Sequence, residues 1–205
     1  MTILTLPIQQ QHKLDLLNEE VKKCTKCYDL CQNRIQTVFG EGDPDADIMF
    51  IGEAPGETES KTGKVFSGPA GQLLDSILKA CELRRKDVYI ANIVKCRPPK
   101  NRIPSPEEAH NCSSFLQEQI AIVNPRFIVC LGSVASNKIV GLRISQARGQ
   151  WFYYKHHKVL CSYHPAYLLR NPKAKPLVWE DLQMLLKEMK DEIHQEADNP
   201  KTTET

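Results

Sequence analysis

The sequence lacks long apolar runs, and no stretch approaches the roughly 20 consecutive apolar residues that a membrane-spanning helix needs. Its first residues also lack the basic start, apolar run and cleavage site of a secretory leader. We therefore expect a protein that works inside the cell, in the cytoplasm, with no membrane partner.

The sequence also lacks an excess of charge of either sign. It has 27 Lys and Arg residues and 25 Asp and Glu residues, for a net charge of +2. Any nucleic-acid binding must come from local basic clusters rather than from a field of the whole molecule.

There are no internal repeats and no low-complexity blocks. A chain of 205 residues that is 41% hydrophobic can bury one substantial core. We expect a monomer with one domain over residues 1–194 and a polar tail at 195–205.

Short apolar segments alternate with segments of helical periodicity. The predicted strands are 47–51, 88–94, 127–131 and 158–162, and the predicted helices are 14–21, 69–78, 105–123, 133–140 and 177–193. This alternation argues for an α/β sandwich whose mostly parallel sheet is covered on both faces. Binding sites in such folds lie beyond the carboxyl ends of the strands, where the segments beginning at Gly52, Asn92 and Tyr163 fall.

Eight cysteines in a chain without a secretory leader favour reduced thiols or metal ligands over disulfides. Cys24 and Cys27 are two residues apart, and Cys96 with Cys112 could complete four thiolates. From spacing alone a structural zinc, a [4Fe-4S] cluster and four unconnected core cysteines all stay open. Cys31 is a reserve ligand. Three other cysteines lie in apolar patterns that favour burial in the core: Cys81, Cys130 and Cys161.

Several polar or aromatic residues near the strand ends are candidates for a site. The turn 52–56 combines glycines, which allow close backbone approach, with the carboxylate of Glu53, although a plain turn with a solvated Glu fits as well. Phe66 could stack on a ligand or simply pack underneath. Asn92 interrupts an apolar strand, so its buried amide either binds a ligand or ties two loops together. His164 ends a strand ahead of a short apolar and basic loop, and a satisfied core histidine is its alternative reading.

Taken together, these motifs resemble the family 4 uracil-DNA glycosylases, the iron-sulfur branch of their superfamily. The resemblance covers about residues 20–190 and is carried by five segments in order: 52–56, 62–68, 71–74, 92–99 and 164–171. It implies an α/β/α fold and uracil-containing DNA as the partner, met at the nucleoid. It also implies a [4Fe-4S] cluster on Cys24, Cys27, Cys96 and Cys112.

The same resemblance implies roles for the remaining candidates. A flipped uracil would enter a pocket formed by residues 52–54 (Gly52, Glu53 and Ala54), Phe66, Asn92 and His164. Glu53 and His164 would be catalytic, the first toward water and the second toward the departing base. The residues Leu168, Leu169 and Arg170 would form a wedge that fills the vacated stack. The alternative is that the leucines are core residues of a short helix.

Two departures from related branches bear on the chemistry. The better-known branch has an aspartate at the place of Ala54, so water activation must differ here. Another relative traps uracil through a histidine in an insertion that the segment 98–106 lacks, which favours turnover. A non-catalytic iron-sulfur protein that binds nucleic acid is the alternative from another class. A redox carrier is disfavoured because the cysteines lack a compact ferredoxin run.

Overall fold

A six-stranded sheet in the order β1-β3-β2-β4-β6-β5 forms the centre of the molecule in the computed structural model, which describes residues 6–198. The four inner strands are parallel, and the two edge strands β1 and β5 run antiparallel to their neighbours. The strands are β1 (Glu41–Gly42), β2 (Ile48–Gly52), β3 (Tyr89–Asn92), β4 (Phe127–Leu131), β5 (Trp151–Tyr154) and β6 (His157–Ser162).

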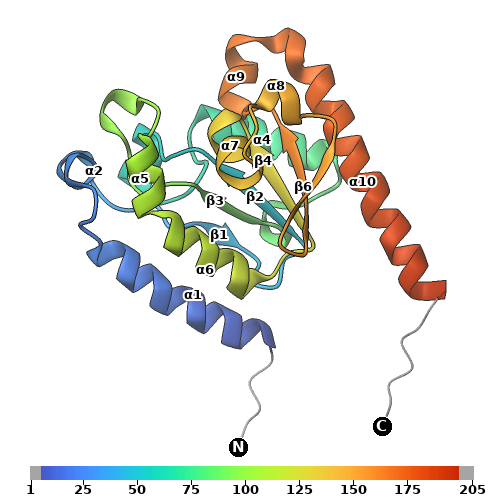
Figure 1. Cartoon of the computed structure of the whole chain (residues 1–205), viewed down its shortest axis with the longest axis horizontal. Coiled ribbons are helices and arrows are strands. Elements are labelled where there is room, and N and C mark those ends of the chain that lie inside the picture. Colours follow the sequence, from blue (N-terminus) through green and yellow to red (C-terminus); the bar gives the residue numbers. More distant parts are fainter. Residues whose placement is uncertain (1–5, 199–205) are drawn as a thin grey trace, which may run out of the picture.

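Helices cover both faces of this sheet (Figure 1). One face packs against α1 (Leu6–Lys23), α6 (Ser113–Val123), α7 (Ser133–Val140) and α8 (Ile144–Ala147). The other face packs against α4 (Pro69–Ala80), α9 (Pro165–Arg170) and α10 (Lys175–Asp198). Side chains alternate between the faces of a strand, so Met49 and Ile51 join the first core while Ile48 and Phe50 join the second. The predicted three-layer α/β/α sandwich is confirmed.

The four inner strands all correspond to predicted ones, and most helices begin near their predicted starts. The predicted capping box is present, because Ser105 Oγ accepts from the Glu108 N–H at 3.1 Å. The single helix predicted for 105–123 is wrong, since α5 (Pro106–Asn111) and α6 are separate helices that meet at Cys112. At that junction ψ is −9°, which breaks the regular helical path.

Several short elements were not predicted. They are α2 (Tyr28–Asn33), α3 (Glu57–Thr62), the edge strands β1 and β5, the helix α8, the helix α9 in place of the loop predicted after His164, and three 3₁₀ turns, η1 (Arg85–Asp87), η2 (Pro99–Asn101) and η3 (Pro172–Ala174). The six residues of α3 are all polar or charged, so they carry no apolar period from which a helix could be read.

The last helix is longer than predicted and reaches Asp198. The predicted tail at 195–205 therefore begins as helix, and residues 199–205 lie outside the described part of the chain. No helix within residues 6–198 combines the length and apolar character needed to cross a membrane. The three cysteines predicted for the core, Cys81, Cys130 and Cys161, are buried.

The order of the strands creates a natural place for a site. The chain leaves β2 through α4 on one face of the sheet and leaves β3 through α6 on the opposite face. The carboxyl ends of neighbouring parallel strands splay apart at such a reversal, and ligands bind there.

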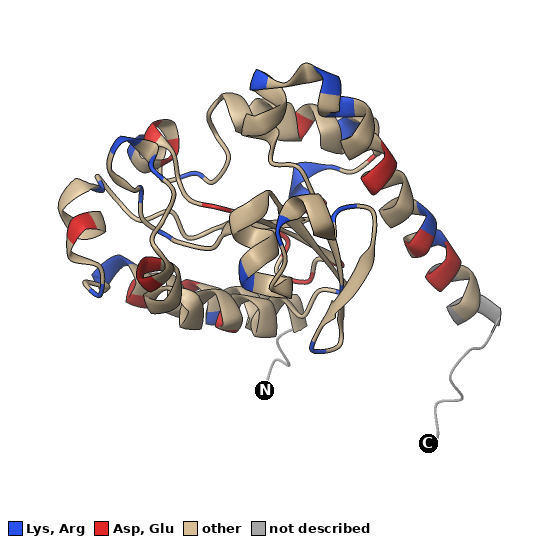
Figure 2. Cartoon of the chain, turned by 45° about the horizontal axis from the view of Figure 1, so that its top comes forward, with Lys and Arg blue, Asp and Glu red and all other residues tan. Residues whose placement is uncertain are grey.

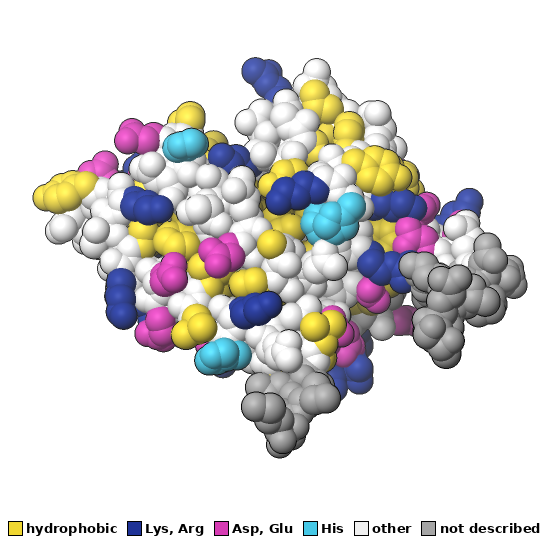
Figure 3. Space-filling model, turned by 60° about the horizontal axis from the view of Figure 1, so that its bottom comes forward, with side chains coloured by type: hydrophobic (Ala, Val, Ile, Leu, Met, Phe, Trp, Pro, Cys, Tyr) yellow, Lys and Arg dark blue, Asp and Glu magenta, His cyan; other side chains and the backbone are white. Residues whose placement is uncertain are grey.

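On the face toward which α1 and α6 lie, acidic and basic side chains are interspersed (Figure 3). That mixture differs from the single-sign surface that attracts DNA.

Candidate active site

Three predicted site segments meet at the carboxyl edge of the sheet. Gly52 ends β2 and is the register partner of Asn92, which ends β3. The pairing continues past the strands, because the Ile93 N–H donates to the Gly52 carbonyl at 2.9 Å. His164 follows the end of β6 by two residues. Residues from distant parts of the sequence are thus held close by strand pairing.

Gly52 allows two other site residues to approach the backbone closely. A Cβ atom at this position would lie 2.4 Å from Asn92 Oδ1 and 2.7 Å from two ring carbons of Phe66. Contacts that short do not occur between real atoms, so any side chain here would displace the amide or the ring. Gly52, Phe66 and Asn92, three of the predicted pocket residues, therefore lie next to one another.

Asn92 carries an unusual unpaired atom. Its residue is 2% exposed, and among the described residues its buried Oδ1 has no hydrogen-bond partner. A buried acceptor left unpaired costs about 1–3 kcal/mol, so native structures rarely keep one without a purpose. The atom is suited to accept from an N–H of a ligand.

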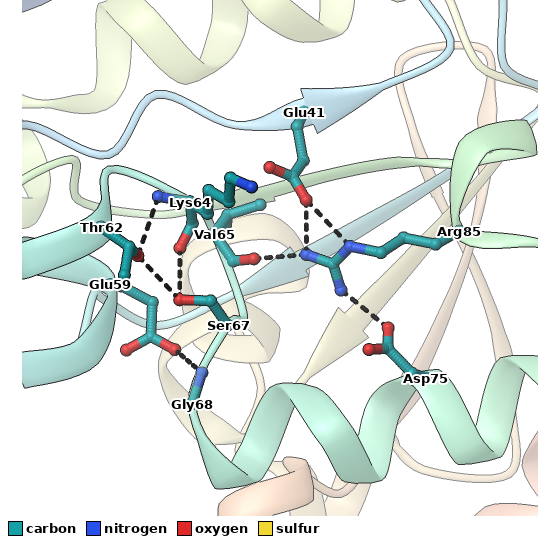
Figure 4. Close-up of polar contacts among 9 residues, drawn as sticks. All are labelled: Glu41, Glu59, Thr62, Lys64, Val65, Ser67, Gly68, Asp75 and Arg85. Atoms are coloured by element: carbon teal, nitrogen blue, oxygen red, sulfur yellow. Dashed lines mark hydrogen bonds and ion pairs between the residues drawn. The ribbon is translucent and has the colours of Figure 1, made fainter.

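The loop that carries Phe66 is held from both sides, by Glu59 and by Arg85, whose contacts with the loop are drawn in Figure 4. The Glu59 carboxylate accepts from the Gly68 N–H at 2.7 Å and from the Gly56 N–H at 3.0 Å. On the other side, the Arg85 guanidinium donates to the Val65 carbonyl. Phe66 itself has a φ of 47°, a left-handed conformation that a phenylalanine keeps only when its surroundings enforce it.

Arg85 is a residue that the sequence reading missed. Its guanidinium also pairs with Glu41 at 2.8 Å and with Asp75 at 2.9 Å, which links the loop to β1 and α4. Packing closes the same loop, because a Cβ on Gly71 would lie 1.6 Å from the Phe66 carbonyl oxygen. Nothing near Arg85 in the sequence marks it as part of a site, because its partners lie 10 to 44 residues away.

The imidazole of His164 is held in one tautomer. Its Nδ1 accepts from the Ala166 N–H at 3.1 Å at the start of α9, so the neutral ring carries its proton on Nε2. Burial and then the charge of Arg170 lower the pKa of His164 to about 4, which keeps the ring neutral at pH 7. The ring stacks against Phe66 with 5.5 Å between centroids.

Glu53 stands beside the same basic side chain. Burial raises the pKa of Glu53, and the charge of Arg170 acts in the opposite direction. Arg170 therefore acts electrostatically on both predicted catalytic residues, disfavouring a charged His164 and favouring an ionised Glu53. A neutral donor and a carboxylate at one strand edge can serve a reaction in which negative and positive charge develop on neighbouring atoms.

The predicted wedge is corrected in one residue. Leu168 is 1% exposed and belongs to the core on the face where α9 contacts α4, so it cannot enter DNA. The reason is helical geometry, because α9 turns by about 100° at each residue and sends neighbours in different directions. Leu169 is 49% exposed, and Arg170 is exposed. With exposed Lys173 and Lys175, Arg170 gathers basic charge where α9 passes into α10 (Figure 2).

The four predicted cluster cysteines line one cavity. Cys24 follows α1, Cys27 precedes α2, Cys96 follows β3 and Cys112 joins α5 to α6. Cys31 lines the cavity too. Within residues 6–198 no three His, Cys, Asp or Glu side chains already stand in a metal-binding arrangement. The shared cavity nevertheless brings thiols from four segments together, although spacing alone had left four unconnected cysteines open.

Hydrogen bonds at the sulfur atoms differ between the predicted ligands and Cys31. Arg34 Nη1 donates to Cys96 Sγ at 3.0 Å, and Asn111 Nδ2 approaches Cys27 Sγ at 3.9 Å. Donors of this kind favour thiolates and are typical of cluster sites. Cys31 differs, because its own Sγ donates to the Cys24 carbonyl at 3.6 Å. Side-chain donors thus reach two of the four predicted ligands, Cys96 and Cys27, whereas Cys31 acts as a donor itself.

The fold and the strand-edge site define a class. The chain belongs to the uracil DNA glycosylase superfamily, whose family model matches residues 39–183. Within it the chain belongs to the type-4 family. It is 46% identical to the type-4 uracil-DNA glycosylase of Thermotoga maritima, over 85% of this chain and 93% of that protein. Identity to the type-4 enzyme of Archaeoglobus fulgidus is 41%, over 79% and 86%. A type-5 enzyme of Pyrobaculum aerophilum is 37% identical over 63% of this chain and 66% of its own.

Proposed function

We propose that this protein is a monofunctional uracil-DNA glycosylase, which flips uracil out of DNA, cuts its N-glycosidic bond and leaves an abasic site. The observation that carries the proposal is the unpartnered Oδ1 of Asn92 beside Gly52 and Phe66. The names of the type-4 relatives support the same activity.

Recognition would begin with the edge of the base. Asn92 Oδ1 accepts from N3–H of uracil, and the amide N–H of the same side chain faces O4. Cytosine has no proton on N3 and an amine in place of O4, so both contacts become repulsive and a buried acceptor stays unpaired. Phe66 supplies a flat apolar face for the ring, and the absence of a side chain at Gly52 leaves room for it.

The chemistry would follow from the two groups at the strand edge. As the bond between C1′ and N1 breaks, its electron pair stays with uracil, and negative charge grows on O2. The Nε2–H of His164 donates to that oxygen, and a neutral imidazole can do so without giving up its proton. Glu53 positions the water that attacks C1′ and offsets the positive charge of the sugar. Uracil leaves as an anion, and the proton released by the water passes to Glu53 or to solvent.

DNA would be held outside the pocket by α9 and the basic residues beside it. Leu169 is the exposed apolar residue available to fill the gap left by a flipped base, and Arg170 can contact a phosphate. Acting on chromosomal DNA places the protein in the cytoplasm at the nucleoid. We also propose that it acts as a monomer and that residues 1–194 form its single domain.

The cavity lined by α2, the segment after β3 and the end of α5 would hold a [4Fe-4S] cluster on Cys24, Cys27, Cys96 and Cys112. Burial raises the pKa of Cys27, of Cys112 and of Cys96, the last to about 11, so these thiols ionise only when a bound cation stabilises the thiolates. Base excision by hydrolysis has no electron-transfer step, so the cluster supplies structure. Protein purified without oxygen should contain iron and sulfide, and stoichiometric zinc in their place would overturn the assignment. Cys112→Ser should lose the cluster while Cys31→Ser keeps it.

The deciding assay uses matched oligonucleotides that carry uracil, thymine, cytosine or hypoxanthine. Uracil should be released and an abasic site left behind. Binding without any product would favour the alternative of a non-catalytic iron-sulfur protein. His164→Ala should slow the single-turnover rate by a factor on the order of 100 to 1,000, the cost of one lost donor to a developing anion. His12→Ala changes an exposed histidine on α1 and should keep the full rate.

A further inference from the structure

Lys95 is a buried basic residue that the proposed chemistry does not use. It is 1% exposed and lies between Asn92, at the end of β3, and Cys96. Its Nζ donates to the main-chain carbonyl of Asn92 at 2.8 Å and to Oε1 of Gln119 on α6. Gln119 is itself fixed, because its Nε2 donates to the Phe39 carbonyl at 3.0 Å. The ammonium therefore joins the end of β3 to the helix behind it.

The charge of this ammonium has no carboxylate to balance it. Both of its acceptors are neutral, and no ion pair joins Lys95 to an Asp or Glu within residues 6–198. A buried cation without an anion nearby costs several kcal/mol. The groups near it that can carry negative charge are the thiols of Cys96 and Cys112.

Other contacts tie the same segment to the cysteines. Lys95 lines the same cavity as Cys96 and Cys112, and from another side Arg34 donates to Cys96 Sγ and, at 2.9 Å, to the Cys24 carbonyl. Two cations thus flank the thiols, one buried and one partly exposed. Four thiolates around an iron-sulfur core carry net negative charge, which these two residues can balance.

We propose that Lys95 is a positioning residue that couples the cluster to uracil recognition. Its ammonium is the buried counter-charge of the cluster thiolates, and through its bond to the Asn92 carbonyl it fixes the strand end whose side chain reads the base. This inference rests on the proposed cluster and the proposed activity. The cluster, although it transfers no electron, then has a role in substrate recognition.

The coupling predicts how the molecule changes when the cluster is lost. Without thiolates the buried ammonium of Lys95 still lacks hydration and has also lost its counter-charge. Its hydrogen bond to the Asn92 carbonyl is therefore weakened. The strand end and α6 then loosen together, because both are acceptors of the same group. The rest of the sheet keeps its own hydrogen bonds and stays as it was.

The test compares the holoprotein with Lys95→Met, Lys95→Gln and the control Lys26→Met. Lys26 is exposed, and its charge also acts on Cys112, but it makes no bond to Asn92. For each protein, iron content, visible absorption and cluster reduction potential are measured beside single-turnover rates on uracil and cytosine DNA. Lys95→Met should hold iron less firmly, show a more negative potential and excise uracil roughly tenfold more slowly or worse, as expected for loss of a residue that orients a ligand. Lys95→Gln keeps a donor without the charge, so its potential should shift as in Lys95→Met while it recovers part of the uracil rate.

Lys26→Met should stay close to the original protein in all of these measurements, because solvent screens its charge. If Lys95→Met keeps the wild-type potential, iron content and uracil rate, the coupling is wrong. Failure of the unmodified protein to bind iron or to excise uracil would instead refute the proposed function on which the coupling rests.

A second measurement needs no variant and so does not depend on whether Lys95→Met folds. Hydrogen exchange is followed in the unmodified protein before and after a chelator removes the iron. Protection should fall at the carboxyl end of β3 and in α6 but not in β4. Unchanged protection at those two places, or an equal loss across the whole sheet, would overturn the proposal.

Discussion

The neutral imidazole of His164 predicts a specific dependence of stability on pH. In an unfolded chain a histidine binds its proton near pH 6.5, whereas in the folded protein burial and Arg170 hold the pKa of His164 near 4. Between these two pH values His164 is protonated in the unfolded state but not in the folded state, so the free energy of unfolding falls as pH falls. A difference of 2.5 pKa units corresponds to about 3 kcal/mol, and this is an upper bound because part of the residue remains exposed.

The measurement compares urea unfolding of the original protein and of His164→Gln from pH 7.5 to pH 4. Gln cannot titrate, and its amide oxygen can still accept from the Ala166 N–H, so the difference between the two proteins isolates the imidazole. The original protein should lose up to about 3 kcal/mol relative to the variant as pH falls through this window. A difference curve that stays flat would show that His164 titrates normally. The neutral-donor role in base release would then lose its basis.

Four further predictions concern residues of the pocket, of its supporting loop and of α9. Gly52→Ala places a methyl group where the base must enter, so the uracil excision rate should fall by at least about 100-fold while the fold, measured by circular dichroism, persists. Arg85→Met frees the loop that carries the stacking ring and should raise KM for uracil DNA, whereas Arg84→Met, which breaks only an exposed ion pair, should leave kinetics unchanged. Leu169→Ala should slow excision from duplex DNA more than from single strands, and equal losses would refute the wedge. Leu168→Ala should instead cost about 2–5 kcal/mol of stability by thermal unfolding.

The sequence allowed the inner strands and the site segments to be predicted, because both leave local signals. Buried parallel strands are continuous apolar runs, and a residue such as Asn92 is conspicuous inside one. The edge strand β5, Trp151–Tyr154, does not alternate between apolar and polar residues, so nothing in its order marks it as a strand.

Features that depend on distant partners could not be predicted. The link from Arg85 to Glu41 spans 44 residues, and Lys95 becomes important only because α6 brings Gln119 beside it. Adjacent residues can also differ completely in environment. Leu168 and Leu169 have the same chemistry, and only the start of α9 at Pro165 decides which of them faces the core.

The candidate site residues lie at the ends of different strands. Base preference can therefore change separately from other properties of the site. In the proposed mechanism Asn92 reads the edge of the base from β3, while His164 acts on the leaving group from beyond β6. The strands β2 and β4 lie between β3 and β6. The spacing between them is set by main-chain pairing and is independent of either side chain. An exchange at Asn92 can therefore alter which damaged base is accepted without moving the group that assists its departure. Selectivity and rate can diverge by single substitutions, and one backbone can serve glycosylases for different lesions.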